Sequence, residues 1–395
     1  MIASMPFAGE MNLRPVVLAV SVATAGVLPA FLTGGLAVQI RDELGFGTAY
    51  LGLAVAIFFA SAAIASVVMG RFVERIGSHM GMRLAAATSA LSLLSVALLA
   101  RSWTGLILCL ILGGLANAMA HPSANLSLAR EVPSNRQGLS FGIKQASIPT
   151  ATLLAGLAVP TIAATLGWRW AFVGGAVLAV AISLSVPKED HVLAPKPKEE
   201  RSGDARFGAL ALLAVGIGLG STAATPLGAF LVGSSVESGI QVGTAGLLLA
   251  LGSAFSIVVR IVFGHLADSM SGGRLRLVAG MLAVGVLGFA LLATGMPWAI
   301  VAGTLLAFGA GWGWPGLFNF AVVHSSPGAP AAATGVTQTG ASSGAAIGPL
   351  VFGFVVEATS YSTAWMVCGG ISLAALAAIL VGRRMLLRDR AAMAG

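Results

Sequence analysis

Charged residues are scarce in this chain of 395 residues, because Asp, Glu, Lys and Arg together make up only 9% of it. A soluble domain carries about a quarter charged residues. Hydrophobic residues make up 57% of the chain, and the mean hydropathy is +0.93. Water cannot accommodate so much apolar surface. The composition therefore excludes a soluble globular protein and indicates a chain embedded in a lipid bilayer.

Several chemical motifs are also missing. The two cysteines, Cys109 and Cys368, both lie in apolar runs, so we predict two buried small side chains and neither a disulfide framework nor a thiol metal site. No glycine-rich phosphate loop with a lysine occurs, which argues against ATP as an energy source, and no metal-ligand cluster occurs. We therefore expect no cofactor and no metal.

Long polar segments are almost absent, and twelve apolar runs fill the chain. A membrane-spanning helix needs about 20 mostly apolar residues. We predict an all-α membrane protein with helices at about Pro15–Val38, Tyr50–Gly70, Leu84–Ala100, Thr104–Ala129, Gly138–Ala163, Trp168–Val186, Phe207–Val232, Val242–Phe263, Leu277–Thr294, Pro297–Val323, Ala331–Val356 and Thr363–Val381.

One long polar stretch divides these helices into six and six. It reads PKEDHVLAPKPKEERSGDAR, with five basic residues, five acidic residues and three prolines. Such a composition is typical of a solvated linker. We predict an N-terminal bundle at 1–187, a cytoplasmic linker at 188–206, and a C-terminal bundle with a short basic tail at 207–395.

The basic residues predict the orientation. The net charge is +8, but the basic residues lie in short loops between apolar runs, which indicates membrane topology and not nucleic-acid binding. With both termini in the cytoplasm, seventeen Lys and Arg residues face that side and three face the other. We therefore expect a multi-pass protein of the inner membrane, and a monomer.

The two halves resemble each other at an offset of about 193–194 residues. Gly142-Ile-Lys-Gln145 matches Gly335-Val-Thr-Gln338, and His121-Pro122 aligns with Trp314-Pro315. The segments starting at Gly167 and Ser360 also match loosely. These coincidences indicate a duplicated six-helix unit, and such halves place a binding site between them near mid-membrane.

A charged glycine motif stands between the second and third predicted helices and recurs between the eighth and ninth. We expect the glycine to end the helix tightly, and an acid and an arginine to pair across the loop as a gate latch. The alternative is a solvated charged loop. The motif residues are Gly70, Glu74, Arg75, Gly77 and Arg83 in the first copy, and Gly264, Asp268 and Arg274 in the second.

This motif resembles the signature of the major facilitator superfamily. Glu74 replaces the usual aspartate, His79 stands where a basic residue is usual, and Ser269 follows the acid of the second copy. With the twelve helices, linker and duplication, the resemblance covers essentially the whole chain. It implies two pseudo-symmetric six-helix bundles that move a small solute by rocking against each other, but it does not identify the solute.

Charges inside the predicted helices are few. None of the fourteen acids lies near the middle of a helix, which argues against an exporter of cationic drugs. Lys144 and Arg260 do lie inside helices, with Arg260 about one turn from the cytoplasmic end of its helix. A charge at mid-bilayer costs about 2.5–3.5 kcal/mol on insertion scales, so it usually faces a wet cavity. The alternative is that both side chains reach the headgroups.

The run from Arg260 to Gly264 and His265 is similar to the helix-8 pattern of monocarboxylate and oxalate carriers of this superfamily. That resemblance implies that Arg260 contacts a substrate carboxylate, with a guanidinium fork that fits it. Lys144 is the second candidate for anion binding.

A polar stripe marks the fourth predicted helix, where Asn117, His121 and Asn125 are four residues apart and share one face. These side chains either line the cavity or bond to another helix. His121 titrates near neutral pH and is a candidate for proton coupling. Weaker cavity candidates are Gln145, Asn319 and Gln338. The tenth predicted helix also carries a cluster of aromatic residues, which either shape the pocket or serve helix packing alone. These residues are Trp312, Trp314, Phe318 and Phe320.

We therefore predict a secondary transporter, not an enzyme, that carries a small organic anion resembling a monocarboxylate, with protons as a symport partner. The alternative is an efflux carrier for hydrophobic drug-like compounds, which predicts a large aromatic pocket. A membrane-embedded enzyme or receptor is a third hypothesis. An enzyme would need paired catalytic groups at matched depth, and His121 has no acid beside it.

Overall fold

The computed structural model describes residues 13–133, 137–188, 207–269, 272–325 and 330–394. All regular structure in these ranges is helical. The helices are α1 Arg14–Gly35, α2 Ala37–Leu44, α3 Thr48–Ile76, α4 Ser78–Leu99, α5 Trp103–Glu131, α6 Gln137–Lys144, α7 Ser147–Ala158, η2 Val159–Ala163, α8 Ala164–Leu166, α9 Trp168–Ser185, α10 Phe207–Glu237, α11 Val242–Ser269, α12 Arg274–Ala293, α13 Pro297–Leu306, η3 Ala307–Gly311, α14 Pro315–Ser325, α15 Pro330–Ala358 and α16 Tyr361–Ala394.

Twelve helical stretches among the described residues are long and apolar enough to cross a membrane, which confirms the predicted number of spans. The fifth span combines α6, α7, η2 and α8, and the tenth combines α13, η3 and α14. Both spans therefore change geometry along their length, whereas the sequence predicts two continuous helices.

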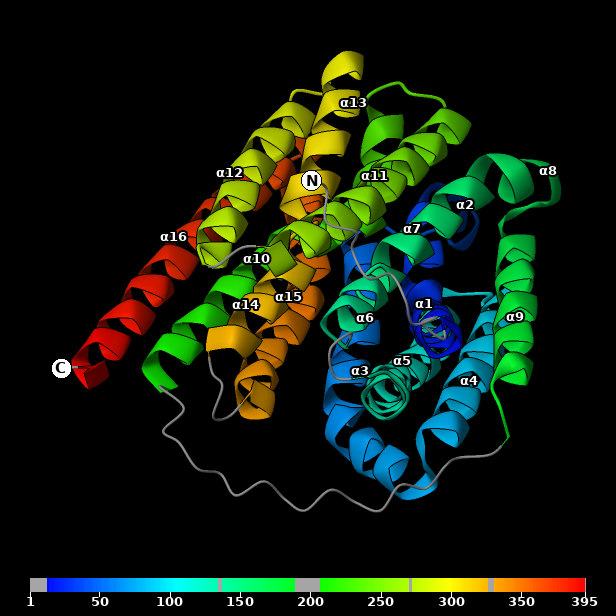
Figure 1. Cartoon of the computed structure of the whole chain (residues 1–395). Helices are drawn as coiled ribbons and strands as arrows, with labels where there is room; N and C mark the ends of the chain where they lie inside the picture. Colours follow the sequence, from blue (N-terminus) through cyan, green and yellow to red (C-terminus); the bar gives the residue numbers. More distant parts are fainter. Residues whose placement is uncertain (1–12, 134–136, 189–206, 270–271, 326–329, 395) are drawn as a thin grey trace, which may run out of the picture.

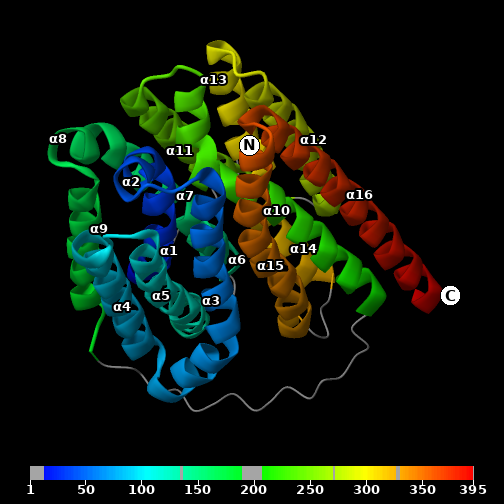
Figure 2. The same cartoon turned by 180° about the vertical axis from the view of Figure 1, so that it is seen from behind.

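The spans form two six-helix bundles, with α1 to α9 on one side and α10 to α16 on the other (Figures 1 and 2). Within the first bundle α5 packs on α1, α3 and α4, and within the second α16 packs on α10 and α12. Helix α9 ends at Ser185 and α10 begins at Phe207. The predicted linker at 188–206 lies almost wholly outside the described residues, so the proposed domain boundaries stay a prediction.

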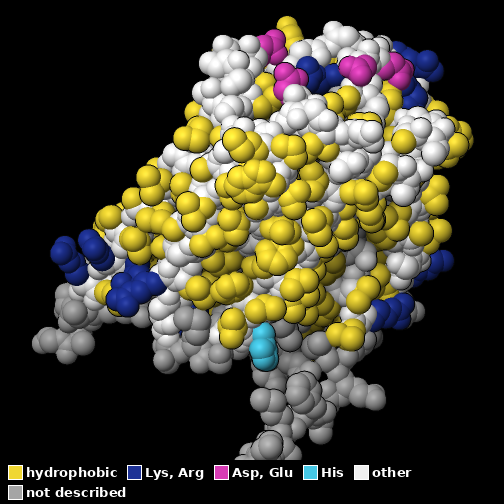
Figure 3. All heavy atoms as spheres, turned by 90° about the horizontal axis from the view of Figure 1, so that it is seen from above, with side chains coloured by type: hydrophobic (Ala, Val, Ile, Leu, Met, Phe, Trp, Pro, Cys, Tyr) yellow, Lys and Arg dark blue, Asp and Glu magenta, His cyan; other side chains and the backbone are white. Residues whose placement is uncertain are grey.

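The outer surface of the protein exposes many large apolar side chains. Figure 3 shows hydrophobic side chains across the middle of one face, with charged side chains at its edges. Ile64 and Leu184, for example, are 82% and 72% exposed. Exposure of this kind suits lipid and not water.

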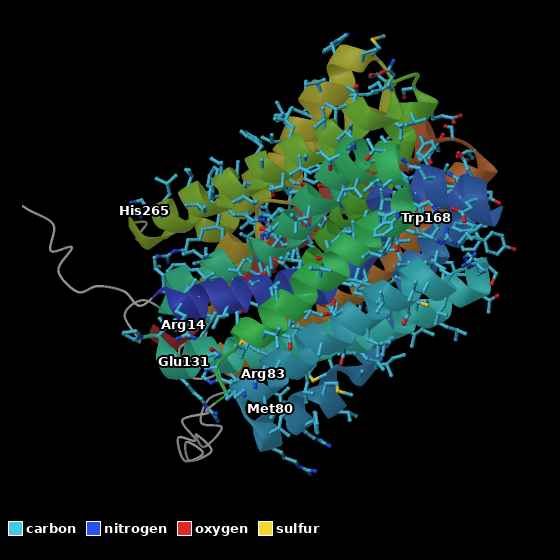
Figure 4. All side chains as sticks on the ribbon, turned by 90° about the vertical axis from the view of Figure 1, so that its right-hand side faces the viewer. Arg14, Met80, Arg83, Glu131, Trp168 and His265 are labelled. Carbon is cyan, nitrogen blue, oxygen red and sulfur yellow. The ribbon has the colours of Figure 1, made fainter. Side chains whose placement is uncertain are left out.

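The two ends of the protein differ. We call the end where α9 ends and α10 begins the linker end, and the other the opposite end. Arg14, Arg83, Glu131 and His265 lie toward the linker end, and Trp168 lies toward the opposite end (Figure 4). Because successive spans run in opposite directions, the odd-numbered spans begin at the linker end and the even-numbered spans begin at the opposite end.

Close contact between the two bundles is concentrated toward the opposite end. Cβ atoms added at Gly34 and Gly52 would collide with the backbone of Ala229 and Pro349, and one at Gly156 would lie 2.6 Å from the nitrogen of Ala250. Glycine at these positions lets backbones from the two bundles touch. The bundles are therefore fastened to each other by close helix contacts on that side.

The glycine motif differs from the prediction in one respect. Gly70 does not end a helix, because α3 continues for six more residues to Ile76, and α11 likewise continues past Gly264 to Ser269. Gly77 ends α3 instead, with a φ of +90° that favours glycine. The expectation of a tight helix end at Gly70 is therefore wrong.

Glycine packing between the bundles can be tested with a matched pair of substitutions. Gly52→Ala should lower the melting temperature, because its new Cβ meets the Pro349 carbonyl and overpacking costs about 1–3 kcal/mol. Gly280→Ala, with nothing within 4 Å of its Cβ, should leave it unchanged or raise it. Cys109 and Cys368 are both buried, so a thiol-reactive dye reports unfolding. Equal melting temperatures for the two variants would contradict this packing.

Candidate functional site

The fifth span is broken beside Lys144. Helix α6 ends at Lys144 and α7 begins at Ser147, and in between the amides of Gln145 and Ala146 bond to carbonyls three residues earlier. Pro149 explains the break, because the residue four positions after Gln145 has no N–H to offer its carbonyl. The carbonyl of Gln145 therefore needs a donor from elsewhere.

Arg260 of α11, in the other bundle, supplies that donor. Its Nη1 donates to the Gln145 carbonyl at 2.7 Å, and its Nη2 donates to the Trp312 carbonyl at 2.5 Å. Ser256, one turn earlier on α11, lies 3.5 Å from the Arg260 Nε. Arg260 is only 6% exposed and stands nine residues before the end of α11. The expected position of Arg260 one turn from the end of its helix is therefore wrong. The alternative in which its side chain reaches the headgroups is also wrong, because the side chain is buried.

A second break lies in the tenth span. Pro315 cannot donate to the carbonyl of Gly311, and the Trp314 Nε1 donates to it instead at 2.7 Å. The indole of Trp312 packs edge-on against Phe31 of α1, with ring centroids 5.8 Å apart. Among the aromatic candidates Trp312 thus lies beside Arg260, whereas Trp314 and Phe318 are fully buried in packing. Phe320 lies under Arg274 instead, 4.8 Å from the guanidinium carbon.

Lys144 is held by the polar stripe of α5. Its Nζ lies 3.0 Å from the His121 Nδ1 and donates to the Asn125 Oδ1 at 2.9 Å. Lys144 is 5% exposed, so it too stays away from the headgroups. The predicted shared face of His121 and Asn125 is therefore confirmed, and both side chains converge on the same ammonium group.

The remaining candidates are arranged less tightly. Asn117 is 6% exposed, and its Oδ1 accepts no hydrogen bond from the described residues. The Gln145 side chain is half-buried, and it is the Gln145 backbone that contacts Arg260. Asn319 is half-buried and Gln338 exposed, and no described contact joins either to Lys144 or Arg260. These two stay predictions.

Neither buried cation has an acidic partner among the described residues. Lys144 bonds to a neutral ring nitrogen and an amide oxygen, and Arg260 bonds to two carbonyls and a hydroxyl. Burying a charge is costly unless it is paired. The site thus combines one cation from each bundle in a region where the protein provides no counter-charge.

Arg260 also marks where contact between α7 and α11 ends. From the opposite end, Gly156 touches Ala250, then Thr152 bonds to Ser253 at 2.7 Å, and then Gln145 accepts from Arg260. Further toward the linker end nothing lies within 4 Å of a Cβ built at Gly142 or Gly264. The two cations therefore sit where the close contact of α7 with α11 gives way to contacts of α6 with α11 and α14.

The expected latch, in which Glu74 and Arg75 pair across the loop, is not formed with the described residues in this arrangement and stays a prediction. Both side chains are exposed and form no ion pair with the described residues, and Arg83 contacts Ser183 only through its backbone carbonyl. The side chain of Asp268 lies outside the described residues. Instead, His79 at the start of α4 pairs with Glu131 at the end of α5 at 3.0 Å, and the Ser127 hydroxyl donates to the same carboxylate.

One contact between the bundles was missed by the sequence analysis. Glu357, near the end of α15, accepts a hydrogen bond from the backbone amide of Ala49 at 2.8 Å. Ala49 lies in the first turn of α3, where free amides and the helix dipole attract an anion. The only sequence signal was an acid at the outer end of the eleventh predicted helix, which said nothing about its partner.

Comparison with known proteins gives one family. The model of the Major Facilitator Superfamily matches residues 16–207 and 234–393. A protein of Agrobacterium vitis named "Putative tartrate transporter" is 22% identical over 390 residues, covering 89% of this chain and 85% of that protein. An uncharacterized MFS-type transporter of Mycobacterium tuberculosis is 23% identical over 353 residues, covering 86% of this chain and 78% of its own.

Solved structures show the same fold at low identity. A bacterial homolog of the human lysosomal transporter Spinster, in an inward-facing and occupied conformation, has a TM-score of 0.75 and 16% identity, covering 96% of this chain and 99% of that chain. A mutant of the nucleoside transporter NupG has a TM-score of 0.72 and 16% identity, with 94% and 100% covered.

The role of Pro149 at the break can be tested with a double-mutant cycle. Pro149→Ala restores an N–H that can bond to the Gln145 carbonyl, so Arg260→Met should destabilise the protein less in that background than in the wild type. A hydrogen bond to a charged group contributes about 1.5–3 kcal/mol, which sets the expected coupling. Melting temperatures of the four proteins measure it. Pro226→Ala in α10 is the control background, and equal coupling in both backgrounds would refute the explanation.

Proposed function

Because the chain belongs to the major facilitator superfamily and is a transporter of a small molecule, we propose that its solute is a small organic anion. The observation that carries this proposal is the pair of buried cations, Lys144 and Arg260, with no acidic partner among the described residues. An anion bound there would supply the missing negative charge.

A carboxylate suits the geometry of both cations. The Arg260 guanidinium is a planar fork of hydrogen-bond donors. In this structure it donates to the carbonyls of Gln145 and Trp312. Lys144 offers three donors and uses two described acceptors. A carboxylate that takes donors from both cations would link the two bundles. Asn117, whose Oδ1 accepts no hydrogen bond from the described residues, adds a polar group on the same helix face as His121.

The name of one relative supports carboxylates as the substrate class. The protein of Agrobacterium vitis is named for tartrate, which carries two carboxylates and two hydroxyls. At 22% identity it guides the choice of compounds for a screen and does not identify the solute. Monocarboxylates and dicarboxylates with and without hydroxyls therefore belong in the same screen.

Alternating access follows from the position of the site. The closest backbone contacts between the bundles lie toward the opposite end, and beyond Arg260 the contact continues through α6, which packs against α11 and α14. The basic loops at the linker end support a cytoplasmic location for that end in the inner membrane. We accordingly interpret this arrangement as inward-facing. Opening the other way requires loss of the Glu357 contact and rocking of one bundle on the other, with the glycine motif residues Gly70, Glu74, Arg75, Gly77, Arg83, Gly264, Asp268 and Arg274 at the closing end.

Proton coupling is proposed through His121. A charged Lys144 has no acceptor to offer, so it can donate to the His121 Nδ1 only while that nitrogen carries no proton. If a bound anion draws Lys144 away, the Nδ1 becomes free to accept a proton. The anion and the proton would then bind together and cross the membrane in the same direction, as in a symporter.

The alternative of an efflux carrier for hydrophobic compounds has less support. The aromatic rings near the site pack against one another: Phe31 contacts Trp312, and Phe308 contacts Trp312 with centroids 5.6 Å apart. Phe31 and Phe308 are almost fully buried. Rings packed in this way do not offer the large aromatic pocket that a drug carrier needs.

Uptake by reconstituted protein tests the anion proposal. Proteoliposomes should accumulate at least one labelled organic acid, and Arg260→Met and Lys144→Met should each reduce uptake by about tenfold or more, as expected for loss of a charge-assisted contact. Arg101→Met, an exposed cation near the opposite end, is the matched control and should transport normally. No uptake of any acid, or normal uptake by both site variants, would overturn the proposal.

Proton coupling has a separate test. Wild-type uptake should rise when the outside is more acidic than the lumen, because protons enter with the anion. His121→Gln keeps an oxygen that can accept from Lys144 but cannot titrate, so it should retain anion exchange and lose the acceleration by the pH gradient. If His121→Gln responds to the gradient as the wild type does, the proton is carried elsewhere.

A further inference from the structure

A cavity of about 380 Å³ opens at the linker end of the second bundle, away from the site between the bundles. It lies between the start of α12, the end of α14 and the last turns of α16. Its polar lining includes Arg274, His324 and Arg383, and its apolar lining includes Leu275, Leu386 and Leu387. The volume is in the range of pockets that hold small ligands, about 300–1,000 Å³.

Positive charge dominates this cavity. Arg276 and Arg384 stand close enough to Arg383 for their like charges to act on it. Arg274 lies over the ring of Phe320, and that ring in turn packs at a tilt against His324, with 4.0 Å between the ring centroids. Among the described residues that line the cavity there is no acid. An anion bound there would relieve the repulsion between these arginines.

At the equivalent position of the first bundle, a carboxylate takes part in hydrogen bonds within the protein. At the repeat offset of 193 residues Glu131 corresponds to His324, and each stands in the last turn of its helix, α5 or α14. In the first bundle the Glu131 carboxylate bonds to His79 and Ser127. In the second bundle a histidine replaces that carboxylate, and arginines and a cavity surround the position. Where the first bundle holds an internal carboxylate, the second bundle thus has a basic cavity.

We propose that this cavity binds the phosphate group of an anionic phospholipid. The guanidinium groups of Arg274 and Arg383 provide the fork of donors that suits a phosphate, and the backbone at the start of α12 adds an anion-favouring helix end. This site takes a ligand that the protein does not transport, and it shares no residue with the pair formed by Lys144 and Arg260.

The apolar side of the cavity favours a lipid over free phosphate. Leu275 and Leu386 line it, and Val381, Met385 and Leu387 along α16 are 46%, 36% and 45% exposed. Because α16 is a membrane span, acyl chains can lie against these side chains while the headgroup enters the cavity. Basic pockets between membrane helices near the headgroup level bind anionic lipids for this reason.

Delipidated full-length protein in detergent provides the test. We expect phosphatidylglycerol to raise the melting temperature more than phosphatidylcholine, and native mass spectrometry to show a bound phosphatidylglycerol that survives gentle activation. Arg383→Ala should weaken phosphatidylglycerol binding about five- to tenfold. Ala321→Phe fills the cavity without changing its charge and should do the same. Arg71→Ala, an exposed arginine at the linker end of the first bundle, is the matched control and should bind as the wild type does.

Three outcomes would overturn the proposal. Equal binding of phosphatidylglycerol by Arg383→Ala and the wild type would remove the cavity from the site. Equal weakening by Arg71→Ala would show general attraction to a basic surface. Stabilisation by inorganic phosphate that matches phosphatidylglycerol would show a free-anion site instead. Because lipid binding is measured without any transported solute, these results are independent of the uptake tests.

Discussion

A freed backbone carbonyl organises the centre of this protein. In a membrane interior each polar backbone group must find a partner within the protein, and Pro149 removes the normal partner of the Gln145 carbonyl. Arg260 takes that place from the other bundle and reaches the Trp312 carbonyl as well. One side chain therefore satisfies two interrupted spans and fastens the bundles together. The same solution recurs with neutral donors, because Ser89 bonds to the Ala25 carbonyl, which Pro29 deprives of its partner.

Arg260, which bonds to the two freed carbonyls, also leaves the site with a positive charge that needs a negative partner. Arg260 brings a charge into a region without described acids, and Lys144 adds a second from the facing bundle. Carbonyls and a histidine nitrogen stabilise the cations as dipoles but do not neutralise them. An anionic solute would complete the site. It would compete with the backbone carbonyls for Arg260, so binding and the packing between bundles would depend on each other.

The duplicated architecture is used unequally. Both halves keep six spans, yet the interrupted helices are the fifth and the tenth, which are not repeat partners. The counterpart of the fifth span, α15, is one continuous helix from Pro330 to Ala358. The linker ends of the two bundles differ as well. In the first bundle Glu131 pairs with His79, and in the second bundle arginines and His324 line a cavity. The basic cavity therefore lies where the two halves differ, and so does the interrupted fifth span beside Lys144.

The sequence by itself determined the twelve spans, the two bundles, the family, and the polar face of His121 and Asn125. These depend on composition, run length and helical spacing, which are local or additive properties. Tertiary structure alone decided that Arg260 contacts Gln145 and Trp312, that Glu131 and not Glu74 pairs at the linker end, and that α3 continues beyond Gly70. The end of α3 is set locally at Gly77, with its φ of +90°, whereas the other two features depend on which groups from distant segments meet. Such partners are separated by 52 to 115 residues along the chain, and no local pattern records them.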